Sequence, residues 1–281
     1  MLKSLRMRLF LRSFLVQGAW NYERMQNVGF AYSLLPVLKA AHTDKKELGR
    51  AVSRHLELFN TQPFMSSLIL GMAARAEELI AAAPAERKAG LEEQLRETKS
   101  AMSTAVAAIG DRLFWGLLRP LSLMLSLVIL GPGLLRYLFT VEKFSAPTTL
   151  PVHASGLLVL ALVAGLLFYN IPAIWLRWRG LAHGYECQGT NSCGVDLMDW
   201  HSHIRKFKFV GFALSAALFL LLLSFFTRDF VFKGDADYGL HSLAVVGFSV
   251  AAALCAKRCG FTSLKAYLAL MAVFVVAFVI F

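Results

Sequence analysis

The amino-acid sequence predicts an all-α integral membrane protein, with amphipathic N-terminal helices followed by about five transmembrane segments. Of the 281 residues, 57% are apolar, 22 are Phe, and the mean hydropathy is +0.57. The apolar residues concentrate after residue 113, in blocks long enough to cross a hydrocarbon layer of about 30 Å. The net charge of +11 comes from basic residues beside these blocks, as expected of loops at an anionic leaflet. Membrane lipids are therefore expected partners, and nucleic acid is not.

The N-terminal segment MLKSLRMRLFLRSFLV predicts an amphipathic helix on the inner face of the membrane. Arginines interrupt its apolar run and no small-residue cleavage site follows, which argues against a signal peptide. The cations are Arg6, Arg8 and Arg12, and the apolar surface comes from Leu9, Phe10, Phe14 and Leu15.

Residues 1–112 form the first of two predicted regions, built from helices of mixed polarity. Pro36 and the segment 42–44 are expected to separate one helix from the next. A further break is expected near residues 61–63. The apolar run 64–74 is too short to span the bilayer, and we expect it to be amphipathic or to enter part-way as a re-entrant helix. Residues 86–99 are expected to form a charged, solvated helix.

Residues 113–281 form the second region, with apolar blocks near 113–139, 153–176, 207–227, 241–256 and 262–281. The first block is expected to break at Gly131-Pro132-Gly133. Basic residues alternate between successive loops. The pattern fits a cytoplasmic N-terminus, five passes and an external C-terminus.

Three short runs concentrate polar side chains near aromatic ones, and each has two interpretations. In WNYERMQN (residues 20–27), one helix face would let Trp20 stack on Arg24 and Glu23 pair with Asn27, as an interfacial anchor. In FNTQP (residues 59–63), the amides suit sugar hydroxyls, or Asn60 and Thr61 cap the next helix. In IGDRLFWG (residues 109–116), Asp111 and Trp115 mark either an interfacial helix end or a polar lining at membrane depth.

The sequence contains no phosphate-binding loop, nucleophile elbow or zinc-protease motif, so no catalytic residue and no cofactor are predicted. His42 and His55 are expected at the surface or at an interface. A zinc site in the loop 183–203 lacks the paired Cys-x2-Cys spacing, and no metal is predicted. The basic loop around Cys187 and Cys193 also argues against a structural disulfide.

These runs, together with YNIPAIWLRWRGLAHGY (residues 169–185), occur in one order along the chain. In that order they closely resemble component IID of the mannose/fructose/sorbose family of the bacterial phosphotransferase system. The resemblance is strongest from about residue 12 to residue 120 and weakens over the last 80 residues.

The resemblance implies a multi-pass permease subunit of the bacterial cytoplasmic membrane that carries no phosphorylated residue. Its implied partners are a IIC membrane subunit, cytoplasmic IIA and IIB phosphocarriers and a hexose, in an oligomer of IIC–IID pairs. Residues expected near the sugar pathway are Asn60, Gln62, Asp111 and Trp115. Residues expected to serve partner binding or gating are Trp20, Asn21, Glu23, Arg24 and Gln26.

Two departures from the family pattern keep alternatives open. Where the family has a Gly- and Pro-containing turn before Ile-Gly-Asp, this chain has AMSTAVAA (residues 101–108), which predicts a more continuous helix. Arg112 replaces the usual Ser. A regulatory or scaffolding protein that has lost transport is therefore a second hypothesis, and a membrane-bound zinc enzyme is a third.

Overall fold

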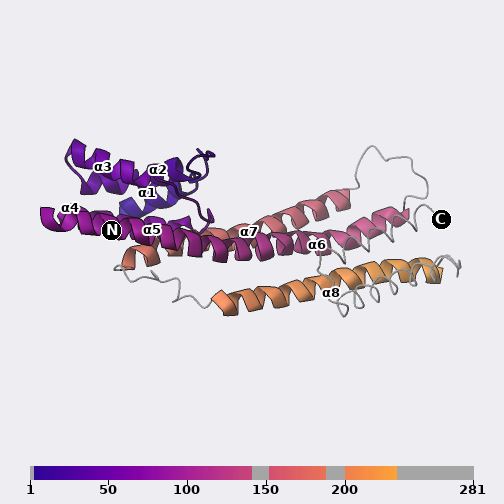
Figure 1. The fold of residues 1–281 in the computed structure, drawn as a ribbon. Coiled ribbons are helices and arrows are strands. Elements are labelled where there is room, and N and C mark those ends of the chain that lie inside the picture. The colour runs from indigo at the N-terminus through magenta and orange to yellow at the C-terminus, as the bar shows by residue number, and fades with distance from the viewer. Residues whose placement is uncertain (1–2, 141–151, 188–199, 233–281) are drawn as a thin grey trace. The chain divides into compact units, whose positions relative to one another are not determined.

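The computed structural model describes residues 3–140, 152–187 and 200–232, and these residues are helical apart from short connections (Figure 1). The helices are α1 (Lys3–Ser13), α2 (Asn27–Ala41), α3 (Lys45–His55), α4 (Ser66–Ala82), α5 (Ala85–Leu113), the π-helical turn η1 (Phe114–Leu118), α6 (Arg119–Thr140), α7 (Val152–Glu186) and α8 (Trp200–Phe232). The last two predicted apolar blocks, 241–256 and 262–281, lie outside the described residues.

The described residues divide into two compact units. Residues 3–130, 152–187 and 200–215 belong to the first, and residues 131–140 and 216–232 belong to the second. The predicted boundary between residues 112 and 113 stays a prediction. In the described part, two helical stretches are long and apolar enough to cross a membrane, Ala85–Gly131 and Ser155–Glu186. All the side chains that we discuss as candidate functional groups lie in the first unit.

Helix α1 forms as predicted, with Leu9 buried and Arg8 exposed, although Met7 and Leu11 are exposed as well. Its place on the inner face of the membrane stays a prediction. The C-terminal end of α1 is held by Arg177 of α7, whose guanidinium donates to the carbonyl oxygen of Ser13 and lies 4.5 Å from the Phe14 ring centroid. A cation at this end complements the helix dipole. The Arg177 side chain is buried between these elements.

Segment 42–44 separates α2 from α3, as predicted. Asp44 caps α3 by accepting hydrogen bonds from the backbone N–H groups of Lys46 (2.9 Å) and Glu47 (3.0 Å). Pro36 lies inside α2 and ends no helix, so that part of the expectation is wrong.

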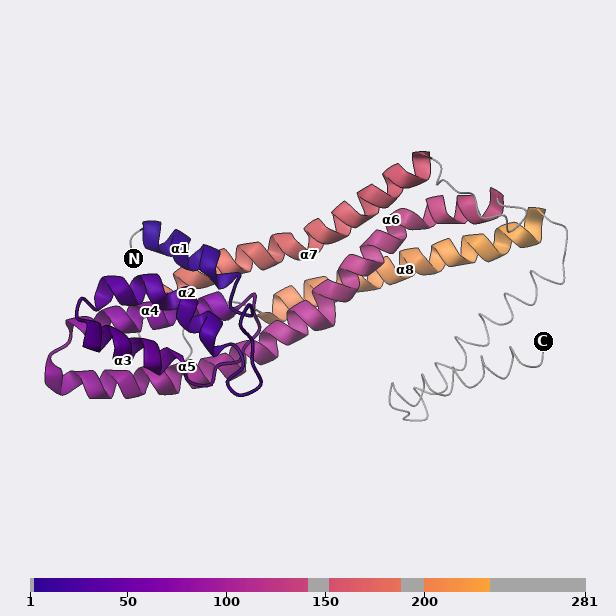
Figure 2. The same ribbon diagram turned by 90° about the horizontal axis from the view of Figure 1, so that it is seen from above.

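Helix α4 is at the centre of the first unit and packs most extensively against α7 (Figures 1 and 2). The two backbones approach so closely that a Cβ atom on Gly184 would overlap the carbonyl oxygen of Leu68, and one on Gly71 would overlap that of Leu181. Small residues permit this approach between helices. The apolar start of α4 is therefore covered by protein, and a re-entrant position in the membrane stays a prediction.

Helix α5 runs without a break through Ala101–Ala108, which confirms the continuous helix predicted from the missing glycine and proline. Helix α5 is followed directly by η1 and then by α6, with no residue between them. The break predicted at Gly131-Pro132-Gly133 is wrong, because α6 stays helical through these residues.

Candidate functional site

The first signature run, residues 20–26, is a tight loop and not a helix. Asn21 and Met25 form an antiparallel bridge, with N···O distances of 3.0 Å in both directions, and Met25 bridges in parallel to Phe59. Met25 has φ of 59°, in the left-handed region that non-glycine residues seldom occupy. Loop 20–26 is thereby joined to the run 59–63.

The contacts expected from a helical run are therefore wrong. The Trp20 ring packs edge-to-face on Tyr22, with centroids 4.8 Å apart, and not on Arg24. Arg24 pairs with its neighbour Glu23 at 3.1 Å, on the surface.

Gln26 connects the two runs through its side chain. Its Nε2 donates to the carbonyl oxygen of Thr61 (2.8 Å), and its Oε1 accepts from the Thr61 backbone N–H (3.2 Å). Both residues are buried. A buried backbone N–H and C=O without hydrogen-bond partners are costly. The Gln26 side-chain amide supplies Thr61 with the donor and the acceptor that a neighbouring strand would otherwise supply.

Asn27 makes the second connection between the loop and the end of α3. Its Nδ2 donates to the carbonyl oxygen of Leu56 (2.7 Å), and its Oδ1 accepts from Nδ2 of Asn21 (3.0 Å). The Oδ1 of Asn21 also accepts from the backbone N–H of Arg24 (2.8 Å). Asn21 and Gln26 thus hold the loop in shape.

The third run, on α5, joins the second through Gln62. The Nε2 of Gln62 donates to Oδ1 of Asp111 (3.4 Å), and its Oε1 accepts from the backbone N–H of Phe64 (3.1 Å). Any Cβ atom on Gly110 would overlap the Gln62 side chain, so the glycine before Asp111 makes room for this amide. Thr61 also donates to the carbonyl oxygen of Ser103 on α5 (3.0 Å).

The capping interpretation of FNTQP is wrong. The residue before α4 is Met65, and no side chain caps that helix. Asn60 is exposed, whereas Thr61 and Gln62 are buried and bonded elsewhere.

The linked runs display aromatic and polar side chains on the surface. Tyr22 is 89% exposed, and Trp20 and Trp115 are nearly half exposed. The Arg119 guanidinium lies 5.0 Å from the Trp115 ring centroid, just beyond the π turn η1. Exposed Trp, Tyr and Arg are the residue types that dominate protein–protein binding energy, and π turns recur at functional sites. The other exposed polar or charged side chains of these runs are Glu23, Arg24, Asn60, Asp111 and Arg112.

Sequence reasoning missed a buried ionic cluster centred on Glu77 of α4. The Glu77 carboxylate is fully buried and accepts from Arg54 through Nε (2.9 Å) and Nη2 (3.1 Å). It also bonds Nε2 of His55 (2.8 Å) and Nε2 of His42 (2.9 Å). The expectation that these histidines lie at the surface or at an interface is wrong, because both are buried inside the helical bundle. Arg54 in turn pairs with Glu92 of α5 at 2.8 Å, so the cluster joins α2, α3, α4 and α5.

The protonation states in this cluster follow from burial and hydrogen bonding. Burial alone would raise the pKa of Glu77, but hydrogen bonds from His55 and Arg54 and the positive charge of Arg54 outweigh it, and the pKa falls to about 2. Burial lowers the pKa of His55, against the opposing effect of Glu77. Neutral His55 must carry its proton on Nε2 to donate to the carboxylate, which leaves Nδ1 buried and without a hydrogen bond. The signal that could have found Glu77 is a lone carboxylate on the apolar helix face that also carries Ala73 and Ile80.

Among residues 3–140, 152–187 and 200–232, no three His, Cys, Asp or Glu side chains could jointly hold a metal ion. Cys193 lies outside the described residues, so the zinc hypothesis stays untested. Cys187 is disulfide-bonded, which contradicts the expectation of a reduced thiol.

Comparison with known proteins gives one consistent result. Residues 2–134 match the family model of the mannose/fructose/sorbose family IID component of the phosphotransferase system. The chain is 34% identical over 194 residues to the mannose-specific EIID component of Escherichia coli K12, covering 68% of this chain and 56% of that relative. It is 32% identical over 144 residues to the fructose permease IID component of Bacillus subtilis, covering 49% of this chain and 50% of that relative.

One solved structure, described as the structure of a membrane protein, superposes with a TM-score of 0.54 at 26% identity, over 77% of this chain and 70% of the other. The chain matches just over half the length of the Escherichia coli relative.

The fold and the linked signature runs define a helical membrane protein with a polar-aromatic N-terminal bundle. The same runs carry the family match. Over residues 2–134 the chain belongs to the IID components of the mannose/fructose/sorbose family of the phosphotransferase system.

Proposed function

We propose that the chain is the IID subunit of a phosphoenolpyruvate-dependent sugar phosphotransferase system. In this proposal it forms, with a IIC subunit, the path by which a hexose crosses the bacterial cytoplasmic membrane. IIA and IIB components phosphorylate the sugar as it is released inward. The chain passes the membrane several times, assembles as an oligomer of IIC–IID pairs, carries no phosphorylated residue and needs no cofactor.

One observation carries the proposal. Three runs that are far apart in the sequence, and that carry the family resemblance, meet in one hydrogen-bonded assembly through Gln26–Thr61 and Gln62–Asp111. A mere interfacial anchor would not need buried amides that connect segments 35 and 49 residues apart.

The geometry divides the candidate residues by task. Asn21 and Gln26 position the loop from within, so they act on a partner through the shape of the loop. Trp20, Glu23 and Arg24 are exposed and are the groups that can touch a IIC subunit.

The candidate pathway residues divide in the same way. Gln62 is buried and orients Asp111, whereas Asn60, Asp111 and Trp115 are open to a sugar or to a second subunit.

The test is phosphoenolpyruvate-dependent hexose uptake by cells that lack their own hexose permeases. The chain is expressed with candidate IIC, IIA and IIB components, and IIC–IID assembly is followed by co-purification. We expect uptake, and we expect Arg24→Ala or Glu23→Ala to reduce co-purification and uptake more than Glu97→Ala on the exposed face of α5. Glu92 is no suitable control, because it pairs with Arg54.

The rival proposal is a regulatory or scaffolding protein, favoured by the unbroken α5 where the family has a turn. A stable complex with IIC and no uptake of any hexose would support this rival and reject the transport proposal.

A further inference from the structure

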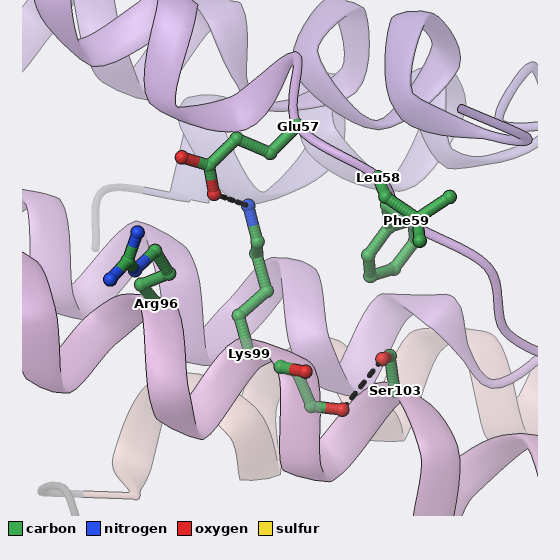
Figure 3. Close-up of a pocket in the computed structure, with 7 residues that line it drawn as sticks. Glu57, Leu58, Phe59, Arg96, Lys99 and Ser103 are labelled. Atoms are coloured by element: carbon green, nitrogen blue, oxygen red, sulfur yellow. Dashed lines mark hydrogen bonds and ion pairs between the residues drawn. The ribbon is translucent and has the colours of Figure 1, made fainter. Parts of the chain in front are cut away.

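A pocket of about 190 Å³ lies between α5 and the segment that follows α3 (Figure 3). Lys99 rises from α5 toward Glu57, with Arg96 on one side and Leu58 and Phe59 on the other. At this volume the pocket fits one small group and not a whole cofactor. Neither the proposed transport path nor the partner surface uses it.

The pocket has a buried cation in its wall. The side chain of Lys99 is only 4% exposed, and its ammonium donates one hydrogen bond, to the carbonyl oxygen of Arg54 (3.0 Å). Glu57 Oε2 lies 4.0 Å away, within ion-pair range but beyond a hydrogen bond. An ammonium has three N–H donors, so it can still donate to a ligand. Removing a cation from water is costly unless an anion or hydrogen bonds compensate.

The other polar groups of the pocket are mostly donors. Arg96 also lines the pocket, is more than half exposed, and pairs at 2.8 Å with Glu93, which does not line it. Ser100 and Ser103 add two hydroxyls, one helical turn apart on α5. The Ser103 hydroxyl donates to the Ser100 carbonyl oxygen (2.8 Å), so the Ser100 hydroxyl is the one that can donate to a ligand. Two cations and the Ser100 hydroxyl around one small space match the several acceptor oxygens of a tetrahedral oxyanion.

The remaining walls are an apolar side and one carboxylate. Phe59 is buried, and Leu58 is 65% exposed at the entrance. Such a wall suits the organic part of an ester. The Glu57 side chain is nearly half exposed and lies 4.0 Å from the Lys99 ammonium without a hydrogen bond, so an incoming anion can displace it.

We propose that this pocket binds the phosphate group of a small phosphate monoester, with Lys99 and Arg96 as its cations and Glu57 as the competing internal anion. The inference is independent of the proposed transport function. Binding is measured on the full chain alone in detergent, so a failure of transport would not imitate a failure of binding.

The experiment is isothermal titration of the purified chain with glycerol 3-phosphate, with inorganic phosphate and glycerol as comparison probes. We expect glycerol 3-phosphate to bind more tightly than inorganic phosphate, and glycerol not to bind. Arg96→Ala should weaken binding roughly two- to fivefold, as for an exposed charge pair. Arg87→Ala, an exposed cation on the same helix, should leave it unchanged.

The decisive variant is Glu57→Gln, which keeps the shape of the side chain and removes the competing charge. It should tighten binding roughly three- to tenfold, because a charge about 4 Å from the ammonium is partly screened by water. A purely structural role of Glu57 would weaken binding or leave it unaltered.

Unchanged or weaker affinity in Glu57→Gln, or equal losses in Arg96→Ala and Arg87→Ala, would overturn the proposal. Binding of short-chain phosphatidic acid but not of glycerol 3-phosphate would assign the phosphate to a lipid head group and overturn the soluble monoester.

Discussion

Glu77→Gln tests whether the buried ionic cluster holds the N-terminal helices together. The substitution keeps the size of the side chain but removes the charge that neutralises Arg54. It also replaces one acceptor oxygen by an NH2 group that faces the donor of either His42 or His55. Removing one partner of a buried pair costs about 3–5 kcal/mol. Arg54 keeps Glu92 at 2.8 Å and is 11% exposed, so we expect the lower end, about 3 kcal/mol.

The assay is thermal unfolding of the purified chain in detergent, followed by tryptophan fluorescence. A loss of about 3 kcal/mol corresponds to a midpoint lower by roughly 6–12 °C for a unit of this size. Glu93→Gln removes an exposed carboxylate paired with Arg96 and should shift the midpoint by no more than about 2 °C. If the unfolding midpoint of Glu77→Gln also shifts by no more than about 2 °C, the cluster does not contribute substantially to the stability of the bundle.

Three further predictions use the same unfolding assay. The pKa of His55 is lowered in the folded protein, so below about pH 6.5 this side chain binds a proton in the unfolded state but not in the folded state. The free energy of unfolding should therefore fall as the pH drops from 7 to 5.5. The contribution of Glu77 is complete above its unfolded pKa of 4.5 and is lost progressively between that value and about 2, below the pH range tested. His55→Gln should therefore flatten the slope between pH 7 and 5.5, and an unchanged slope would contradict the assignment. Gly184→Val should destabilise the protein by about 1–3 kcal/mol, because the new side chain would overlap α4. Gly90→Ala adds a methyl group in open space on α5 and should stabilise the protein by about 0.5–1 kcal/mol. A loss of stability at both positions would count against close packing as the cause. Gln26→Leu should cost about 2 kcal/mol or more by leaving both backbone groups of Thr61 unpaired, and a neutral effect would mean that water replaces the amide.

Local patterns in the sequence predicted much of the fold correctly. The helix at the N-terminus, the break at segment 42–44 and the unbroken α5 were all expected, and the last follows from the absence of Gly and Pro in residues 101–108. Local patterns failed for prolines, because whether a proline ends a helix depends on the surrounding structure. Pro36 and Pro132 lie within helices although each was expected to mark a break.

The candidate site shows where such reasoning stops. The sequence identified Gln26, Gln62 and Asp111 as unusual, and the family resemblance grouped them. Nothing in the sequence indicates that Gln26 bonds Thr61 or that Gly110 makes room for Gln62, because each contact depends on how α2, α4 and α5 pack. The loop shape of residues 20–26 was missed for the same reason, since its bridge partner Phe59 lies more than thirty residues away.

The sequence by itself determined a helical membrane protein, its family and the residue types of its polar runs, since hydropathy, helical period and motif order are properties of the chain. Only the tertiary structure decided that His42, His55 and Arg54 converge on Glu77, and that Lys99 is in the wall of a pocket. The physical reason is that the protonation and partners of a charged side chain depend on its burial and on neighbours from other helices. Those neighbours are set by packing and not by position along the chain.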